Sequence, residues 1–335
     1  MPERNCVARI GIDLGGTKIA GAVLDDSGVI VEEQRLATPR DDYAATLAAI
    51  ADLVNVLDPT ASLSVGIGTP GSMIPESGRM HNCNSTWLNG QRLLADLSER
   101  LGGRVRIAND ADCFALSEAN GGSGAGARSV FGVILGTGVG GGIVLDGTLL
   151  AGASGLAGEW GHNLLPEFPD PAFAQLNTLL RSRQCYCGQL NCVETFLSGP
   201  GLALTHDQLW GERSTAQAVY RQAAGTAFVW EPDLAAVNPA LQAQATLSVY
   251  GRMLVLGLAQ IVNVLDPEVI VLGGGLSKMQ SIYQPVQNAL AERVFGGRGA
   301  TRLRAPRFGD AGGVRGAAWL WDKSRAMQRD IEKDN

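Results

Sequence analysis

The sequence predicts a mixed α/β fold, and three observations indicate it. With 335 residues, of which 45% are hydrophobic and 18% charged, the chain can bury one large core or two smaller ones. Three β-branched runs near the start follow one another without an intervening helix, as in an antiparallel meander. From there on, short apolar runs alternate with segments of helical period, an order typical of α/β architecture.

The first 120 residues have the clearest pattern. Apolar residues recur every three or four positions from Tyr43 to Leu57, which predicts a helix there, and Asp25-Asp-Ser-Gly28 is a turn signal between two strands. The expected elements are, in order, strands at 7–13, 19–24 and 29–35, a helix at 43–57, a strand at 63–68, a helix at 91–101, a strand at 105–108 and a helix that ends at Ala119.

The remaining chain is less regular. We expect a glycine linker at 121–126 and an irregular stretch from about 147 to 240 that contains one helix, near Phe173–Leu180. The other expected elements are strands at 130–135 and 141–145, a long helix at 243–265, a strand at 268–272, a helix that ends near Phe295 and a last helix at 312–322. The charged tail beyond it is expected to fray.

A glycine turn lies between the first two strands, in Ile10-Gly-Ile-Asp13-Leu-Gly15-Gly16-Thr17-Lys18. Glycine permits the backbone angles and the close approach that lay N–H groups against a phosphate. The order Gly-Thr-Lys reverses the last two residues of a P-loop, and a strand follows where a P-loop has a helix. Asp13 favours a phosphate turn over an ordinary tight hairpin, because an acid here is suited to hold a hydrated Mg²⁺.

A second glycine turn follows in Val133-Ile-Leu-Gly136-Thr137-Gly138-Val139-Gly140-Gly141-Gly142-Ile143. It matches the dinucleotide pattern G-x-G-x-x-G, and Glu159 lies near the offset of a ribose-binding acid. A strand continues through Ile143-Val-Leu145 where that pattern requires a helix, so we do not expect a Rossmann site. Two such turns predict two walls around one polyphosphate.

The pair Asn109-Asp110 lies where a strand becomes a helix. The simplest interpretation is a helix N-cap. Because the pair lies between the two glycine turns in the sequence, we expect Asp110 to take a proton from a hydroxyl that attacks the polyphosphate. Asp112 is then expected to cap the helix.

Three cysteines lie within eight residues, in Cys185-Tyr-Cys187-Gly188 and at Cys192. Soft thiolates around a tight glycine loop favour tetrahedral Zn²⁺, and His162 is the nearest upstream histidine and the expected fourth ligand. The alternative is a cluster of reduced, buried thiols. The other three cysteines are expected to be structural: Cys6, Cys83 and Cys113.

Two acids, Glu159 and Glu194, each lie within three residues of an expected metal ligand. A structural zinc would hold both carboxylates in place, and carboxylates and Asn are natural hydrogen-bond partners of sugar hydroxyls. The alternative is a pair of solvated surface acids.

Composition excludes several classes of protein. The formal net charge of -6 gives a nucleic-acid role no electrostatic support. No run reaches the roughly 18–20 apolar residues of a membrane span, and the most apolar helical stretch, 253–265, is interrupted by Gln260 and Asn263. No signal-peptide pattern opens the chain, so we expect a cytoplasmic protein with reduced thiols.

Taken in order along the chain, these motifs resemble the ROK family of bacterial sugar kinases. The resemblance covers nearly the whole chain, and the set of motifs is specific. The motifs that carry it are Asp13–Lys18, Asn109–Asp112, Leu135–Gly142, Gly158–His162, the cysteine cluster with Glu194, Gly273–Ser277 and Gly309–Gly313. Asn191 stands where the family has a glycine, and Asn tolerates left-handed backbone angles.

The resemblance implies the actin-like ATPase (ribonuclease H-like) fold, with two α/β domains hinged over a cleft. The first domain would span 1–120 and be completed by the C-terminal helix in 310–335; the second would span 121–309 and carry the zinc loop and the long helix. The resemblance also implies ATP and Mg²⁺ as cofactors, structural Zn²⁺, and a homodimer.

The resemblance assigns site residues one by one. Asp110 would be the base, Asp13 would hold Mg²⁺ through water, and His162 would bridge zinc and sugar with one ring nitrogen to each. The nucleotide would lie against Gly11, Ile12, Asp13, Leu14, Gly15, Gly16, Thr17, Lys18, Gly136, Thr137, Gly138, Val139, Gly140, Gly141, Gly142, Ile143, Gly273, Gly274 and Gly275. The sugar would lie against Gly71, Asn84, Asn109, Asp110, Glu159, His162 and Glu194. The zinc ligands would be His162, Cys185, Cys187 and Cys192.

Several segments resemble the fructokinase (mannofructokinase) branch of the family, among them 38–43, 84–90 and 314–321. We therefore expect ATP-dependent phosphorylation of D-fructose at the 6-hydroxyl. The alternatives are an N-acetyl-D-glucosamine kinase and a broader mannose or glucose kinase. A sugar-responsive regulator of the same family is not expected, because no helix-turn-helix precedes the first glycine turn. An actin-like or chaperone ATPase would not explain the Glu and His residues around the cysteines.

Overall fold

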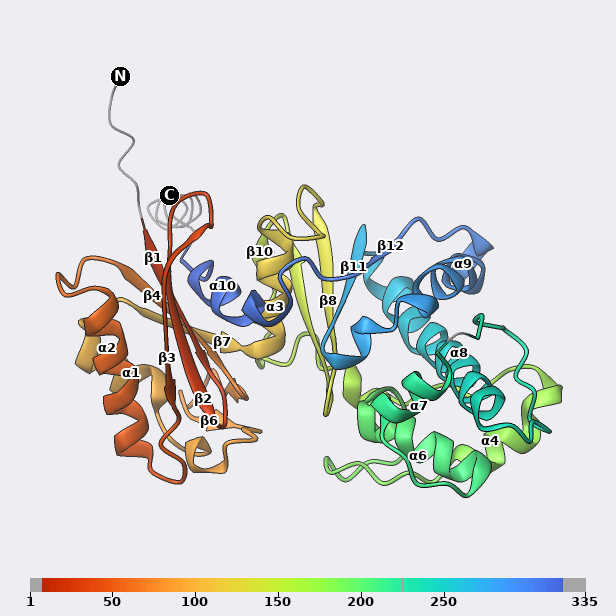
Figure 1. The fold of residues 1–335 in the computed structure, drawn as a ribbon. Coiled ribbons are helices and arrows are strands. Elements are labelled where there is room, and N and C mark those ends of the chain that lie inside the picture. Colours follow the sequence, from red (N-terminus) through yellow and green to blue (C-terminus); the bar gives the residue numbers. More distant parts are fainter. Residues whose placement is uncertain (1–7, 225, 322–335) are drawn as a thin grey trace. The chain divides into compact units, whose positions relative to one another are not determined.

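The computed structural model describes residues 8–224 and 226–321, and its chain divides into two compact units (Figure 1). Unit 1 comprises 1–126, 142–157 and 307–335, and unit 2 comprises 127–141 and 158–306. The division predicted from the sequence differs in grouping 142–157 with the second part, and it stays a prediction. Mixed α/β architecture is confirmed, because sheets and helices occur in both units.

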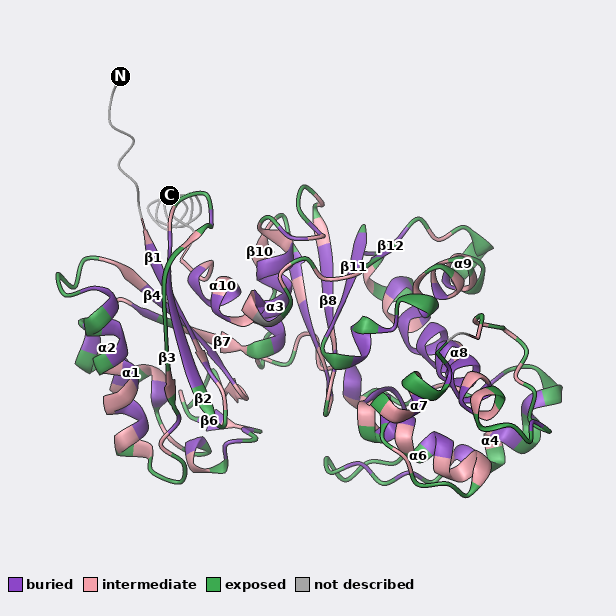
Figure 2. Cartoon of the chain, viewed as in Figure 1, coloured by how far each residue is buried: buried purple, intermediate pink, exposed green. Residues whose placement is uncertain are grey.

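The first sheet has five strands in the order β3-β2-β1-β4-β7. The three N-terminal strands pair antiparallel, which confirms the predicted meander, and β4 and β7 run parallel to β1. The strands are β1 (Arg9–Leu14), β2 (Lys18–Leu24), β3 (Ile30–Ala37), β4 (Ser64–Thr69) and β7 (Val105–Asn109). The outer strand β3 is exposed along most of its length, whereas β1 and β2 are buried (Figure 2).

Helices pack against this sheet through side chains that alternate along its strands. Ile10 and Ile12 of β1 are fully buried in a core with α1 (Tyr43–Leu57) and α2 (Leu93–Leu101). Gly11, between them in the strand, faces the other way, toward α10 (Gly312–Ala318), which also packs on α3 (Asp110–Ala119).

Glycines in the sheet let α10 lie directly on its backbone. A Cβ at Gly11 would lie 1.9 Å from the carbonyl oxygen of Val314, and a Cβ at Gly66 would lie 1.7 Å from that of Ala317. Neither distance is compatible with a side chain, so both positions require glycine.

The second sheet has the order β10-β9-β8-β11-β12. In it β8, β11 and β12 run parallel, and β9 and β10 pair antiparallel. The strands are β8 (Ser129–Leu135), β9 (Val139–Leu145), β10 (Thr148–Leu149), β11 (Val269–Gly273) and β12 (Arg302–Arg304). The remaining short elements are β5 (Ser72–Met73), β6 (Met80–His81), η1 (Thr86–Leu88), η2 (Trp160–His162), η3 (Pro171–Phe173), η4 (Gly275–Lys278), η5 (Gln280–Ile282), η6 (Phe295–Gly297) and η7 (Gly309–Ala311).

Unit 2 is rich in helices around one long central helix, α8 (Pro239–Leu265). This helix packs against α5 (Glu194–Leu197), α6 (Gly199–Trp210), α7 (Ala216–Gln222) and α9 (Tyr283–Arg293). The expectation of a single helix between 147 and 240 is wrong, because three further helices occur there. Pro200 and its neighbouring glycines indicate a turn in the sequence, yet the Ser198 hydroxyl accepts the Gly201 N–H and starts a helix. Helix α4 spans Ala174–Leu180.

Among the described residues, helix α8 is the one helix that is long and apolar enough, by length and composition alone, to cross a membrane. However, 83% of its most apolar 18-residue stretch is buried inside the protein. A core helix has both properties, and Figure 2 shows α8 buried along most of its length. The last helix, α10, ends at Ala318, and the predicted end at Asp322 and the predicted frayed tail lie outside the described residues.

Candidate active site

The first glycine turn joins β1 to β2 and has the predicted form. The Gly15 N–H donates to the Lys18 carbonyl (3.0 Å), which closes the turn, and the Thr38 hydroxyl donates to the Gly15 carbonyl (2.7 Å). Gly16, Thr17 and Lys18 are exposed. The turn therefore presents its backbone to solvent at the end of the antiparallel pair β1 and β2.

Asp13 lies at the end of β1, against the start of α10. A Cβ at Gly313 would lie 2.9 Å from its Oδ2 atom, so glycine makes room for the carboxylate. Burial raises the pKa of Asp13, and the nearby charge of Lys18 lowers it in part. An ionised carboxylate held in this way gains from a bound cation.

Asn109 and Asp110 lie where β7 becomes α3, as predicted. The side-chain oxygen of Asn109 accepts the Asp112 N–H at 2.6 Å, so Asn109 is the N-cap and the capping role expected of Asp112 is wrong. The physical reason is that β7 delivers Asn109 with an extended backbone, which a cap residue needs. Asp110 is the first helical residue, is exposed, and accepts its neighbour's N–H from Ala111 (2.8 Å).

The carboxyl ends of parallel strands bring these residues of unit 1 together. Asp13 pairs with Gly68, and Thr69 pairs with Asn109 in the sheet register. The Thr69 hydroxyl makes hydrogen bonds to the carbonyls of Gly71 (2.8 Å) and Ala108 (3.0 Å). Ligands of open α/β sheets bind at such strand ends.

Gly71 and Asn84, two predicted sugar contacts, are neighbours. A Cβ at Gly71 would lie 2.6 Å from the Cys83 sulfur, and the Asn84 N–H donates to the Pro70 carbonyl (3.3 Å). Cys83 and Cys113 are buried free thiols, consistent with a structural role, and Cys6 lies outside the described residues.

The second glycine turn, between β8 and β9, is closed by an acid from elsewhere in unit 2. The Gly136 N–H donates to the Gly138 carbonyl (3.0 Å), and the Val139 N–H donates to Oε2 of Glu194 (2.9 Å). A Cβ at Gly138 would lie 2.5 Å from that same oxygen. Glycine at 138 thus makes room for the Glu194 carboxylate.

The segment Gly158–His162 lies directly on this turn. The indole N–H of buried Trp160 donates to the Gly140 carbonyl (2.9 Å). A Cβ at Gly161 would lie 2.2 Å from the Val139 carbonyl oxygen. Glu159 and His162 are therefore held at the second turn by the residues between them.

Four side chains gather as a candidate metal site, as predicted: their ligand atoms all lie within 4.8 Å of one another. Cys185 Sγ lies 3.6 Å from His162 Nδ1, and Cys187 Sγ lies 3.6 Å from Cys192 Sγ. Thiolates about 2.3 Å from a tetrahedral Zn²⁺ lie roughly 3.8 Å apart, so the donor set and the spacing fit this ion.

The loop that carries Cys185, Cys187 and Cys192, called the metal loop below, is held in place by hydrogen bonds of Asn191 and Arg183. Asn191 has a φ of 59°, the left-handed conformation that the sequence predicts it to tolerate, and its side-chain oxygen accepts the Arg183 N–H (3.0 Å). The buried guanidinium of Arg183 donates to the carbonyls of Thr195 (2.8 Å) and Gly201 (3.2 Å). These bonds connect the loop to α5 and α6.

Tyr186 is a site residue that the sequence does not predict. Its hydroxyl lies 3.1 Å from Nε2 of His162, and the two rings meet edge to face with centroids 5.2 Å apart. Burial and the nearby charges of Glu194 and Glu159 raise the pKa of Tyr186 to about 12, so both acids lie near it. The sequence contains one hint of this role: Tyr186 lies between two expected metal ligands, Cys185 and Cys187, so its own side chain is expected to point away from the metal.

Gly273–Gly275 follow β11 and lie beside the second turn. Gly273 pairs with Ile134 of β8, and Gly274 has a φ of 77°, with its Cβ position 2.4 Å from the Leu135 carbonyl oxygen. Only glycine fits there.

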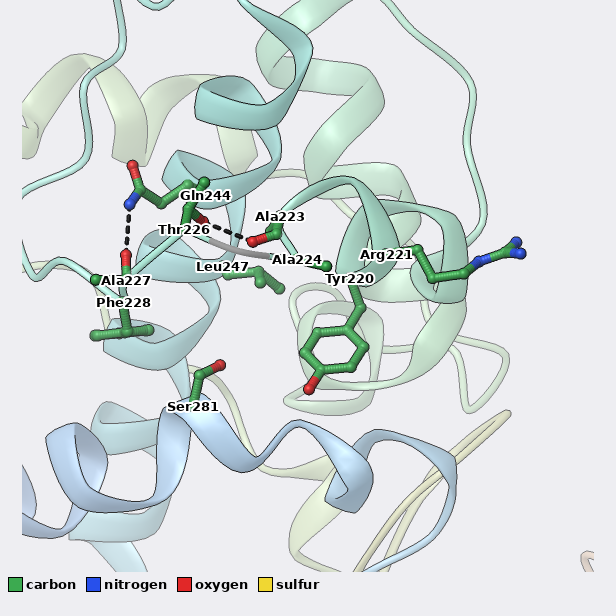
Figure 3. Close-up of a pocket in the computed structure, with 10 residues that line it drawn as sticks. All are labelled: Tyr220, Arg221, Ala223, Ala224, Thr226, Ala227, Phe228, Gln244, Leu247 and Ser281. Atoms are coloured by element: carbon green, nitrogen blue, oxygen red, sulfur yellow. Dashed lines mark hydrogen bonds between the residues drawn. The ribbon is translucent and has the colours of Figure 1, made fainter.

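A pocket in unit 2, unpredicted from the sequence, opens between α7, α8 and η5 (Figure 3). It holds about 280 Å³, and Tyr220, Leu247 and Ser281 surround it. Hydrogen bonds from the Gln244 amide to the Ala227 carbonyl and from the Thr226 hydroxyl to the Ala223 carbonyl order one side. Its other lining residues are Arg221, Ala224 and Phe228.

Comparison with known proteins identifies relatives of this chain. The ROK family model matches residues 9–324. An N-acetyl-D-glucosamine kinase of Salmonella paratyphi B is 38% identical over 312 residues, covering 92% of this chain and 98% of that protein, and one of Citrobacter koseri matches equally well.

Solved structures agree. The ROK hexokinase of Thermus thermophilus has a TM-score of 0.75 at 27% identity, covering 96% of this chain and 99% of that one. A ROK family glucokinase of Streptomyces griseus, in complex with glucose and AMPPNP, has a TM-score of 0.67 at 27% identity, covering 93% and 98%. These relatives support an ATP-dependent sugar kinase but not the expected fructose specificity, and the N-acetylglucosamine alternative fits better.

Proposed function

Because this chain belongs to the ROK family and is an ATP-dependent hexose kinase, we propose that it phosphorylates N-acetyl-D-glucosamine at the 6-hydroxyl. The observation that carries this proposal is the 38% identity, over 92% of the chain, to kinases of that sugar. The sugar, the site residues, the metal ions, the homodimer and the cytoplasmic location are parts of the proposal.

Asp110 is the proposed general base. It is exposed at the carboxyl end of β7, and the N-cap bond of Asn109 holds the backbone on which it is carried. A carboxylate in this place accepts the proton of the sugar 6-hydroxyl as that oxygen attacks the γ-phosphate. Asn109 supplies a neighbouring amide for the sugar.

The phosphates are proposed to lie against the two glycine turns. Gly16 and Thr17 present exposed backbone, and Asp13 lies at the base of the same turn. Mg²⁺, when bound, neutralises charge on the phosphates, and the raised pKa of Asp13 is consistent with a carboxylate that awaits a cation.

We assign the adenine base to the pocket of Figure 3. Its residue Ser281 follows the Gly273–Gly275 turn through two short helical turns, and the volume of about 280 Å³ suits a planar heterocycle. Ala224→Trp would fill the pocket and raise the KM for ATP without changing that for the sugar. An unchanged KM for ATP would remove the pocket from the nucleotide site.

Glu159, His162 and Glu194 are the proposed sugar contacts of unit 2. Two of them are carboxylates, and all three side chains are only partly buried. His162 turns Nδ1 toward Cys185, so Zn²⁺ at the cysteine cluster would fix the ring and leave Nε2 for a sugar hydroxyl. Carboxylate and imidazole groups in this pattern suit a polyhydroxylated ligand.

One steady-state panel tests the substrate. ADP release is measured with N-acetylglucosamine, fructose, mannose, glucose and no sugar, and the sugars are compared by kcat/KM. We expect N-acetylglucosamine to exceed the others by at least tenfold. Fructose in first place would restore the specificity that segments such as 84–90 favour, and sugar-independent ADP release would indicate an ATPase.

A further inference from the structure

Tyr186 makes a contact that the proposed chemistry does not use. Its hydroxyl lies 3.1 Å from Nε2 of His162, while Nδ1 of the same ring lies 3.6 Å from the sulfur of Cys185. We propose that Tyr186 is a specificity-determining residue whose hydroxyl holds the place of a sugar hydroxyl on His162 and is displaced when the sugar binds. This inference rests on the proposed function.

The ring nitrogens of His162 allow one partner each. With Nδ1 directed at the metal site, the Nε2 proton is the single donor that remains. One N–H makes one good hydrogen bond, so the Tyr186 hydroxyl and a sugar hydroxyl compete for it. Binding of the sugar therefore includes the loss of the Tyr186 bond.

The side chain of Tyr186 is positioned so that it can move away from His162. It is 76% exposed, and its hydroxyl and its ring both contact the His162 ring. Its neighbours Cys185 and Cys187 direct their sulfurs to the metal site, so the backbone is fixed while the tyrosine side chain projects outward. A rotation about its own side-chain bonds frees Nε2 without moving a metal ligand.

The carboxylates of Glu159 and Glu194 belong to the same part of unit 2, which we call the polar corner. Glu159 is the N-cap residue of η2, which ends at His162, and Glu194, two residues after Cys192, accepts the Val139 N–H. A sugar that presents a hydroxyl to His162 regains the hydrogen bond that Tyr186 gives up. A sugar that lacks a hydroxyl at that point cannot displace the Tyr186 hydroxyl from His162. That sugar therefore finds this part of the binding site occupied. Discrimination of this kind depends on the tyrosine hydroxyl and not on its ring.

The test is Tyr186→Phe, which removes only the hydroxyl. Tyr43→Phe is the matched control, because it removes the hydroxyl that donates to Asp96, and neither residue is a proposed contact of the sugar or the nucleotide. In zinc-loaded Tyr186→Phe we expect the KM for N-acetylglucosamine to fall about two- to fivefold, from the loss of one competing hydrogen bond. The kcat, the KM for ATP, the zinc content and all values of the control should stay unchanged.

Calorimetric titration of the sugar without ATP should show the same two- to fivefold fall in Kd. An unchanged KM and Kd would show that the hydroxyl does not compete, and a raised KM with full zinc would show that it binds the sugar itself. A raised KM with lost zinc would make it a support of the metal ligand; each of these overturns the inference. A wild-type protein that phosphorylates no sugar overturns the proposed function instead.

Discussion

The two glycine turns look alike in sequence but are built differently. The first has its acid, Asp13, in the strand that leads into the turn, and its exposed residues are tied down by neighbours in the same meander. The second takes its acid from Glu194, 55 residues beyond Val139, just after the last cysteine of the metal loop. The first turn is therefore a local structure, whereas the second depends on the metal loop.

The largest expected effect comes from a substitution in unit 1, which contains the first turn, and it should change kcat and not sugar binding. Asp110→Asn should lower kcat by about 10²- to 10⁴-fold, because the amide cannot accept the proton of the attacking hydroxyl. Sugar Kd by calorimetry should change less than about threefold, since the amide keeps a polar contact. The exposed Asp233→Asn is the matched control, and near-normal kcat in Asp110→Asn would remove Asp110 as the base.

The next largest effect comes from a substitution in the metal loop, on which the second turn depends. Cys187→Ser should lose the metal and raise the KM for the sugar about 10- to 100-fold, because Glu194 and His162 lose their common support. The KM for ATP should change less than that for the sugar. Metal analysis and kinetics measure this, and full activity in metal-free protein would show that the loop holds itself.

Alanine at the two turns gives the sharpest comparison. Gly138→Ala places a methyl group 2.5 Å from Oε2 of Glu194, so we expect kcat/KM to fall at least tenfold as that carboxylate is displaced. Gly16→Ala meets within the protein only the Ser85 hydroxyl, at 3.4 Å, so any loss should appear in the KM for ATP, while the KM for the sugar should change by less than about threefold. Equal losses at both positions would contradict the difference between the turns.

The smallest effect is on stability. Burial raises the pKa of Asp13, so the folded state holds that proton more tightly than the unfolded state, and stability is lost as the pH rises through the folded pKa. Asp13→Asn should therefore melt at a higher temperature than the wild type at pH 7 without Mg²⁺, and the gap should close toward pH 4. A constant gap across that range would assign the effect to packing.

The parts of the fold that the sequence predicts are those with strong local periodicity. The helix at Tyr43–Leu57 has the predicted bounds, and the meander β1–β3 is matched to within two residues at each end. Helix α6 escaped prediction because Gly199-Pro200-Gly201 has the composition of a turn, and β12, three residues long, is too short for any period.

The candidate site shows the same division between local and distant causes. The cysteine spacing identifies ligands that do gather, because the loop is short. The bond from Val139 to Glu194 and the contact of Tyr186 with His162 join distant segments, and no spacing rule contains them. The cap is Asn109 and not the expected Asp112, because only the backbone conformation decides among neighbouring acids and amides, and Asn109 has the extended backbone of a cap residue.

The glycine contacts of α10 have a consequence for the order of synthesis. Gly11 and Gly66 pack against a helix that begins at Gly312. One face of the first sheet therefore cannot be covered by this helix until almost the whole chain has left the ribosome. Until then the backbone of the sheet is exposed at these two glycines. A nascent chain stalled just before residue 312 would therefore be a better client for chaperones than the full-length chain, in which α10 covers these glycines.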